Sequence, residues 1–252
     1  MEWYCILLIC LGCLALLILL SALLYKQFFK RFYDVVLSGL AIIVLSPLFL
    51  ILTIVGAIVM KGNPFFVQER PGKKDKNGKE KIFSIIKFRT MSNVKDKNGN
   101  LLPDDKRLNG YGKFLRSTSL DELPELFNIL IGDMAVIGPR PQLVRDMVFM
   151  SEEQRHRHDV RPGLSGLAQV NGRNNITWEQ KFKYDLEYCK AITFLNDVSL
   201  IFKTISKVFK REDTVREGTV SDIDFGDWLL QEGKITKDEY DEKQLEAKEL
   251  LK

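Results

Sequence analysis

Histidine and cysteine are scarce in this chain: two His and four Cys among 252 residues. Zinc enzymes draw most of their ligands from these two residue types, so a zinc enzyme is not indicated. His156 and His158 are two positions apart, which places them on different faces of a helix, and we expect structural roles for both. Three of the cysteines lie in one apolar run and Cys189 stands alone. The sequence therefore predicts no disulfide framework, and a globular part in a reducing compartment.

The net charge is only +4, but it is unevenly distributed. From Gly218 to the end the chain carries ten acidic and five basic residues, so the part before it is more basic than the whole. A basic body suits an anionic membrane surface or phosphorylated substrates. We expect no nucleic-acid partner.

The first apolar run, Cys5 to Leu24, contains no charged residue. Its length is about the 20 residues that a membrane-spanning helix needs. A cleaved signal peptide is the alternative, but the start carries Glu2 and no Lys or Arg, and no A-x-A-like cleavage site follows. We expect a retained membrane anchor over residues 1–28.

The second apolar run, Val35 to Met60, is interrupted by Ser46 and Pro47. Proline removes one helical hydrogen bond and kinks or breaks the helix, and the Ser46 hydroxyl can bond a freed carbonyl. A kinked spanning helix is one reading. However, Lys and Arg occur on both sides of the run, and cations prefer the cytoplasmic face. We therefore expect a re-entrant helix over residues 29–62, broken at Ser46-Pro47, with both ends on that face.

A β-hairpin is predicted next, at the start of a catalytic domain spanning residues 63–215. Its strands are Pro64–Gln68 and Ile82–Ile86, with an Asn77-Gly78 turn signal between them. The second strand leads into Lys87 and Arg89, which alternation along a strand places on one side. Taken alone, such a pair is more often a solvated strand face.

Two adjacent carboxylates, Asp121 and Glu122, lie in the stretch Thr118–Glu125. Ser119 and Glu122 fit the capping box of a helix start, and Pro124 favours the first helical turn. A cap alone would explain these residues. A carboxylate in this position can also act as a nucleophile, with its neighbour as base or metal ligand.

Arginine recurs in loops rich in proline and glycine. Arg140 lies between Pro139 and Pro141, which restrict its backbone and suit it to anion binding. The stretches Arg161–Gly166 and Gln169–Arg173 can cradle phosphate through backbone N–H groups. Two amphipathic helices follow, Trp178–Tyr188 and Leu195–Phe209; the second either lies on the membrane surface or faces the core.

The acidic tail, residues 216–252, differs in composition from the rest. We expect two short helices, Asp222–Gln231 and Lys237–Leu251, and the second begins with a Thr236/Glu239 capping box. The pair resembles the small helical hairpin appended to many bacterial membrane proteins. It predicts docking or self-association, with a second copy or a pathway glycosyltransferase as partner.

The order of six motifs resembles the bacterial sugar transferases, the monotopic polyprenyl-phosphate phosphoglycosyl transferases. They are Lys87–Met91, Ser119–Pro124, Gly132–Met134, Gly138–Pro141, Arg161–Gly163 and Gln169–Arg173. An ordered set is far more specific than any one short motif. The extra apolar segment at the start and the acidic tail depart from the core of that family.

The resemblance implies transfer of a sugar-1-phosphate from a UDP-sugar to undecaprenyl phosphate, with release of UMP, at the cytoplasmic face of the bacterial inner membrane. It implies that Asp121 attacks the β-phosphorus, and that Glu122 assists by holding Mg²⁺ together with Asp121 or by deprotonating the acceptor. The fold implied is α/β, mostly helical and membrane-associated. The candidate phosphate-binding cations are Lys87, Arg89, Arg116, Arg140, Arg161 and Arg173.

Two other functions stay open from the sequence. One is a non-catalytic membrane scaffold of a glycan pathway. The other is a glycosyltransferase that moves the sugar without its phosphate and releases UDP. The identity of the sugar is not predicted.

Overall fold

The computed structural model describes residues 2–172, 176–210 and 223–252, and these are mostly helical, as predicted. The helices are α1 (Glu2–Leu23), α2 (Lys30–Met60), α3 (Asp104–Arg107), α4 (Gly110–Thr118), α5 (Glu125–Ile131), α6 (Val144–Met147), α7 (Glu152–Arg155), α8 (Leu167–Val170), α9 (Trp178–Lys190), α10 (Phe194–Lys210), α11 (Phe225–Gln231) and α12 (Lys237–Leu250). The strands are β1 (Phe65–Lys74), β2 (Glu80–Phe88), β3 (Ala135–Ile137) and β4 (Gly163–Ser165). A π-helical turn (Tyr25–Phe29) and two 3-10 turns (Leu120–Glu122 and His156–Asp159) complete the described elements.

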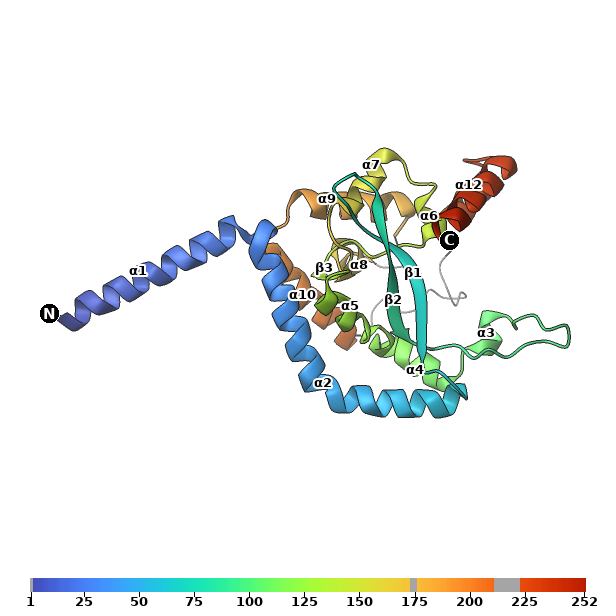
Figure 1. Cartoon of the computed structure of the whole chain (residues 1–252), viewed down its shortest axis with the longest axis horizontal. Coiled ribbons are helices and arrows are strands. Elements are labelled where there is room, and N and C mark those ends of the chain that lie inside the picture. Colours follow the sequence, from blue (N-terminus) through green and yellow to red (C-terminus); the bar gives the residue numbers. More distant parts are fainter. Residues whose placement is uncertain (1, 173–175, 211–222) are drawn as a thin grey trace.

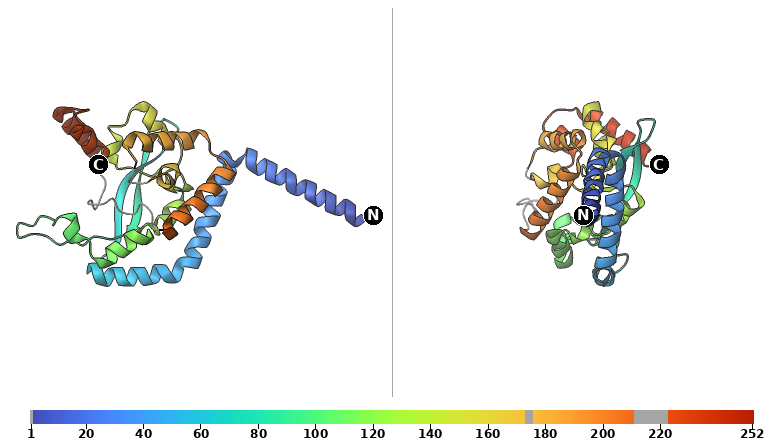
Figure 2. Two further views of the ribbon diagram at one scale, coloured as in Figure 1. Left: turned by 180° about the vertical axis from the view of Figure 1, so that it is seen from behind. Right: turned by 90° about the vertical axis from the view of Figure 1, so that its left-hand side faces the viewer.

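Helix α1 projects away from the body in Figure 1 and in the left view of Figure 2. It contains the first apolar run and carries exposed apolar side chains such as Leu8 and Ile9. Within the described part, the stretch Tyr25–Met60 is the one helix long and apolar enough to cross a membrane. The role of α1 as an anchor stays a prediction.

Helix α2 is bent near its middle but not broken (Figure 1). The prediction of a break at Ser46-Pro47 is wrong, because the helix is assigned without interruption from Lys30 to Met60 with Pro47 inside it. Pro47 has no N–H for the carbonyl of Ile43, four residues earlier. The Ser46 hydroxyl donates to that carbonyl at 2.8 Å instead. This bond was predicted, and it lets the helix pass the proline.

Both halves of α2 are fastened to the same globular body. In the first half, Lys30 forms an ion pair with Asp197 of α10 at 2.6 Å. Arg31 donates to the last carbonyls of α5, at 2.6 Å to Ile129. In the second half, Phe49 and Leu52 are buried in the main core, with residues of β2, α4 and α5. Ala41, Ile42, Leu45 and Leu48, around the bend, also pack against this core, so the helix follows the body on both sides of Pro47.

The predicted hairpin is confirmed, with strands longer than expected. β1 and β2 pair antiparallel from Phe65 opposite Phe88 as far as Lys74 opposite Glu80. β2 contributes Phe83, Ile85 and Phe88 to the main core. Lys87 directly precedes Phe88, so the packing of that ring helps to fix its position.

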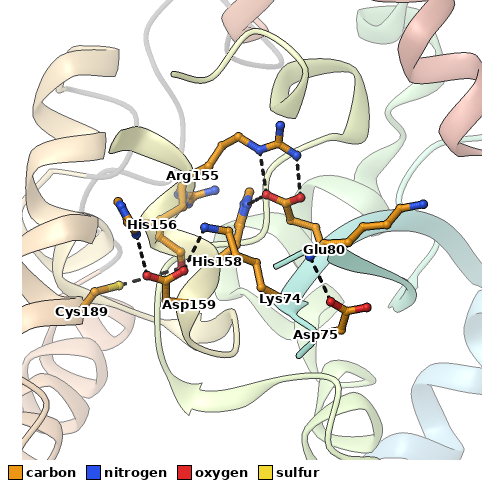
Figure 3. Close-up of polar contacts among 10 residues, drawn as sticks. Lys74, Asp75, Glu80, Arg155, His156, His158, Asp159 and Cys189 are labelled. Carbon is orange, nitrogen blue, oxygen red and sulfur yellow. Dashed lines mark hydrogen bonds and ion pairs between the residues drawn. The ribbon is translucent and has the colours of Figure 1, made fainter. Parts of the chain in front are cut away.

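The turn end of the hairpin is tied down by a buried carboxylate, Glu80 (Figure 3). Arg155 donates to it twice, at 2.8 and 2.5 Å, and His158 Nδ1 lies 3.2 Å away. Burial opposes ionisation of Glu80, but these hydrogen bonds outweigh it and hold its pKa well below the usual range. Burial also lowers the pKa of His158 to about 4. His156 instead meets Asp159 at 2.7 Å, so the two histidines have separate partners.

A second, parallel pair, β3 and β4, brings together two of the motif loops. The amide of Gly138 donates to Ser165, and that of Gly163 donates to Pro139, at 2.8 and 2.9 Å. A Cβ atom on Gly163 would lie 2.1 Å from the Gly138 nitrogen. Glycine is therefore required here for the backbones to approach. The sequence did not predict this pairing.

The tail helices α11 and α12 form as predicted and dock on this same chain. Phe225 is buried against Trp178 and Phe182 of α9, with ring centroids 5.2 and 5.0 Å apart. Arg145 of α6 donates to Asp227 of α11 at 2.9 Å and to Tyr240 of α12 at 2.8 Å. A second copy or a glycosyltransferase as tail partner stays a prediction.

Docking of the tail is expected to weaken as the pH rises. Burial and the neighbouring Asp224 raise the pKa of Asp146 from 3.8 to about 7 in the docked state. Undocking exposes this carboxyl, so the docked state binds its proton more tightly and loses stability between about pH 4 and pH 7. Exchange protection of the α11 amides, corrected for intrinsic rates, should be up to about a hundredfold higher at pH 5 than at pH 8. Asp146→Asn should remove the difference, and an unchanged difference in that variant would contradict this assignment.

Candidate active site

Asp121 and Glu122 lie in the 3-10 turn between α4 and α5. The predicted capping box is wrong: Ser119 adopts φ 56° and ends α4, and its side chain does not cap the turn. Helix α5 begins only after Pro124 and ends, as predicted, at Gly132 with φ 103°. The carboxylates therefore belong to the turn that joins two helices.

Glu122 and the next carboxylate along, Glu125, share a buried cation. Lys87 Nζ lies 3.0 Å from Glu122 and 2.9 Å from Glu125. Arg140 Nη2 reaches the same Glu122 oxygen at 2.7 Å. Burial opposes the charge of Lys87, but the two carboxylates outweigh it and raise its pKa. Burial raises the pKa of Glu125, which is almost fully enclosed. The end of β2, the 3-10 turn, α5 and the loop after β3 all meet here.

The Asp121 carboxylate differs from its two neighbours in its contacts. It makes no hydrogen bond or ion pair to any other residue in the described ranges, although it is half buried. Burial and the adjacent Glu122 raise its pKa, while Lys87, Arg140 and Arg116 pull the pKa down. A desolvated carboxylate with free lone pairs, near three cations, has the features of a nucleophile toward an anionic substrate.

The loop that carries Arg140 is held through three consecutive carbonyls. Pro139 accepts from the Gly163 amide at 2.9 Å. Arg140 accepts from Arg157 Nη2 at 2.6 Å, and Pro141 from Arg70 Nη1 at 3.3 Å. Since its backbone is fixed on both sides, the guanidinium of Arg140 is preorganised.

Among the other predicted phosphate-binding cations, those that the structure describes each have surroundings of their own. Arg116 Nε donates to Thr90 at 3.1 Å, and its charge acts on Asp121. Arg89 follows β2, is half buried, and has no side-chain hydrogen bond or ion pair within the described ranges. Arg161 Nε donates to the Gly132 carbonyl at 2.7 Å, at the end of α5, and contacts none of the three carboxylates among the described residues. Arg173 lies outside the described residues.

Sequence reasoning missed three residues of this site. Glu125 lies in the motif stretch, but nothing in its spacing indicated that it would share Lys87. Arg157 is fully buried, donates to Asp185 at 2.7 Å, and supports the Arg140 loop. Arg70 lies on β1 and meets that loop only after folding. Long-range contacts of this kind leave no local pattern in a sequence.

The donor set is compatible with Mg²⁺. This ion is commonly held by one or two carboxylates together with substrate phosphates and water. Asp121 supplies one untied carboxylate, and Glu122 a second that would share its oxygens with Lys87 and Arg140. The described residues contain no cluster of three or more His, Cys, Asp or Glu side chains that could hold a metal. These two residues would therefore hold the ion only together with substrate phosphates.

Asn128 of α5 is expected to stabilise the fold by joining α5 to β2 beneath the site. Its amide accepts from Ile86 N at 3.1 Å and donates to the Ser84 carbonyl at 2.8 Å, which joins β2 to α5. Asn128→Ala leaves two backbone groups unpaired near the core, and we expect a loss of about 2 kcal/mol or more in unfolding free energy. Thermal denaturation in detergent should show this loss as a lower melting temperature. Asn98→Ala, in an exposed turn, is the control and should melt like the wild type. Equal melting temperatures would show that the contact carries no stability.

Comparison with known proteins defines the class. The bacterial sugar transferase family matches residues 25–211. The uncharacterized sugar transferase EpsL of Bacillus subtilis is 40% identical over 184 residues, covering 73% of this chain and 88% of EpsL. The UDP-glucose:undecaprenyl-phosphate glucose-1-phosphate transferase of Klebsiella pneumoniae is 39% identical over 191 residues, covering 72% of this chain and 40% of that protein. The undecaprenyl-phosphate galactose phosphotransferase of Salmonella typhimurium is 33% identical over 205 residues, covering 74% and 42%.

These matches define the protein as a transferase. It belongs to the bacterial sugar transferase family, and the matched region runs from the turn before α2 to the end of α10. Helix α1 and the tail helices lie outside the match. The chain spans about two fifths of the Klebsiella and Salmonella relatives.

Proposed function

We propose that this protein transfers a sugar-1-phosphate from a UDP-sugar to undecaprenyl phosphate and releases UMP, through a phosphosugar covalently bound to Asp121. The observation that carries the proposal is the contrast among three carboxylates. Glu122 and Glu125 are paired with cations, whereas Asp121 has no partner among the described residues and lies beside the same cations. The named activities of the Klebsiella and Salmonella relatives support the reaction class.

In the first step, an Asp121 oxygen attacks the β-phosphorus of the UDP-sugar, which carries the sugar. The bond between this phosphorus and the oxygen that bridges to the α-phosphate breaks, and UMP leaves with that oxygen. An acyl phosphate remains on Asp121. In-line positioning and neutralisation of the phosphate oxygens are what such a transfer requires.

In the second step, a phosphate oxygen of undecaprenyl phosphate attacks the same phosphorus. The bond to Asp121 breaks, which restores the carboxylate and gives an undecaprenyl diphosphate sugar. Glu122 lies next to Asp121 and would accept a proton from the acceptor phosphate if it arrives protonated. Its pairing with Lys87 and Arg140 orients it for this role.

The cations would stabilise the negative charge that both steps carry. Arg140 is the best placed, because its loop is fixed and its side chain is partly exposed beside Glu122. Lys87 and Arg116 add charge near Asp121. When bound by Asp121 and Glu122, Mg²⁺ would supply further neutralisation of the phosphate oxygens.

At the membrane, we propose that α2 is re-entrant and α1 is an anchor, with the body at the cytoplasmic face of the inner membrane. Support comes from the fastening of both halves of α2 to one body, while Ile43, Val44 and Ile58 are exposed. Cysteines placed at Gln27 and Lys61 in a cysteine-free background test this. Both should react with an impermeant reagent from the same side of the membrane; labelling from opposite sides would rule out the re-entrant path.

The activity itself is tested with a panel of UDP-sugars and undecaprenyl phosphate, with the nucleotide product identified. Release of UMP supports the proposal. Release of UDP would instead make the protein a glycosyltransferase that leaves the phosphate behind. Binding of UDP-sugars without turnover across the panel would favour a scaffold. The same panel identifies the sugar and, through it, the glycan pathway.

A further inference from the structure

An apolar cleft of about 300 Å³ opens beside the carboxylates. It lies between the 3-10 turn of Asp121, the β3–β4 pair and α10, and Ser119, Leu120 and Glu122 form part of its wall. Both chain neighbours of Asp121 therefore line it. Its volume is at the lower end of the range of small-molecule pockets.

The lining is aliphatic. The apolar side chains include Leu120, Leu123, Val136, Ile137, Ile201 and Ile205. The lining that the described residues form includes no aromatic side chain that could stack on a uracil ring. Such a surface suits a flexible hydrocarbon better than a nucleotide or a sugar.

The lining also carries polar side chains, Glu122 and Lys207 among them, and several of the others are hydrogen-bonded within the protein. The hydroxyls of Ser165 and Thr204 lie 2.6 Å apart, and Thr204 also donates to the Leu200 carbonyl at 2.7 Å. The Gln169 amide nitrogen donates to Leu164 at 2.9 Å, which leaves its buried Oε1 atom unpaired. A sugar, with several hydroxyls to satisfy, would find few partners here.

The outer side of the cleft continues onto an apolar face of α10. Leu195 and Phe202 on this helix are 77% and 68% exposed, and Ile205 at the cleft is 46% exposed. A chain that leaves the cleft would therefore stay on apolar surface, as a lipid that reaches the site from a bilayer must.

We infer that this cleft binds the isoprenoid chain of the acceptor next to its phosphate, while the phosphate itself faces Asp121. The inference rests on the proposed function and adds to it a subsite for the lipid on α10. In this arrangement, binding of the acceptor depends on Ile205 and its neighbours, whereas binding of the nucleotide sugar does not.

The two half-reactions provide the test. Ile205→Trp fills the mouth of the cleft, and Lys203→Trp adds the same bulk at an exposed position of the same helix that does not line the cleft. With UDP-sugar alone, the single-turnover burst of UMP should be equal in the wild type and both variants. With undecaprenyl phosphate added, Ile205→Trp should raise the KM for the acceptor tenfold or more, while Lys203→Trp leaves it unchanged.

Each other outcome is decisive. An unchanged acceptor KM in Ile205→Trp, or a slower burst with a higher KM for the UDP-sugar, would overturn the subsite. If Ile205→Trp does not fold, Val208→Trp at the same rim makes the same test. Absence of any UMP burst in the wild type would contradict the proposed function instead, so the two failures are distinguishable.

Discussion

Asp121→Asn is expected to abolish turnover while leaving the fold intact. The amide keeps the shape of the side chain but cannot form the acyl phosphate, so UMP release should fall by about a thousandfold or more. Burial and Glu122 raise the pKa of Asp121, which means that its negative charge is not well stabilised there. Loss of that charge should leave the melting temperature equal or higher. Initial rates of UMP release and thermal denaturation measure the two effects.

Asp105→Asn is the matched control, because Asp105 is exposed and belongs to α3, outside the site. It should retain wild-type rates. Full activity in Asp121→Asn would remove the nucleophile from this account. A lower melting temperature together with lost activity would point to a structural role, which the absence of a bonded partner among the described residues argues against.

Lys87→Met is expected to cost both stability and activity. Glu125 would be left buried without its cation, whereas Glu122 would keep Arg140. Removal of one partner of a buried ion pair costs up to about 3–5 kcal/mol, and protonation of Glu125 limits the loss. Activity should fall by about a hundredfold or more, since one of the cations near Asp121 is lost.

A second substitution separates the two effects. In Lys87→Met with Glu125→Gln, no unpaired carboxylate remains at Glu125, so the melting temperature should recover most of the way. UMP release should stay low, because the positive charge is still missing. Recovery of activity in the double variant would show that Lys87 acts only through stability.

The sequence predicted those parts of the fold that depend on local patterns. The apolar run with Ser46-Pro47 predicted a helix broken at that point, and the bond from the Ser46 hydroxyl to the freed carbonyl was predicted with it. The helix bends but stays continuous, because this bond satisfies the carbonyl that Pro47 leaves free. The hairpin and the helices of the tail were also predicted, with ends displaced by a few residues.

Features set by long-range contacts were not predictable in the same way. The motif Ser119-x-x-Glu122 is typical of a helix start. In the structure Ser119 has a left-handed backbone conformation and ends α4 instead. The β3–β4 pair joins segments far apart in the chain through backbone bonds that any residue can make. Arg161 resembles the site arginines in its sequence context, yet it bonds the end of α5. Only the fold distinguishes such roles.

The most direct test of the central claim is peptide mass analysis of the protein after mixing with a UDP-sugar in the absence of acceptor. The account predicts one added sugar-phosphate, located on the peptide that contains Asp121, in step with the UMP released, and its loss when undecaprenyl phosphate is added. Release of UMP at the full rate with no covalent adduct, or with the adduct on another residue, would contradict it.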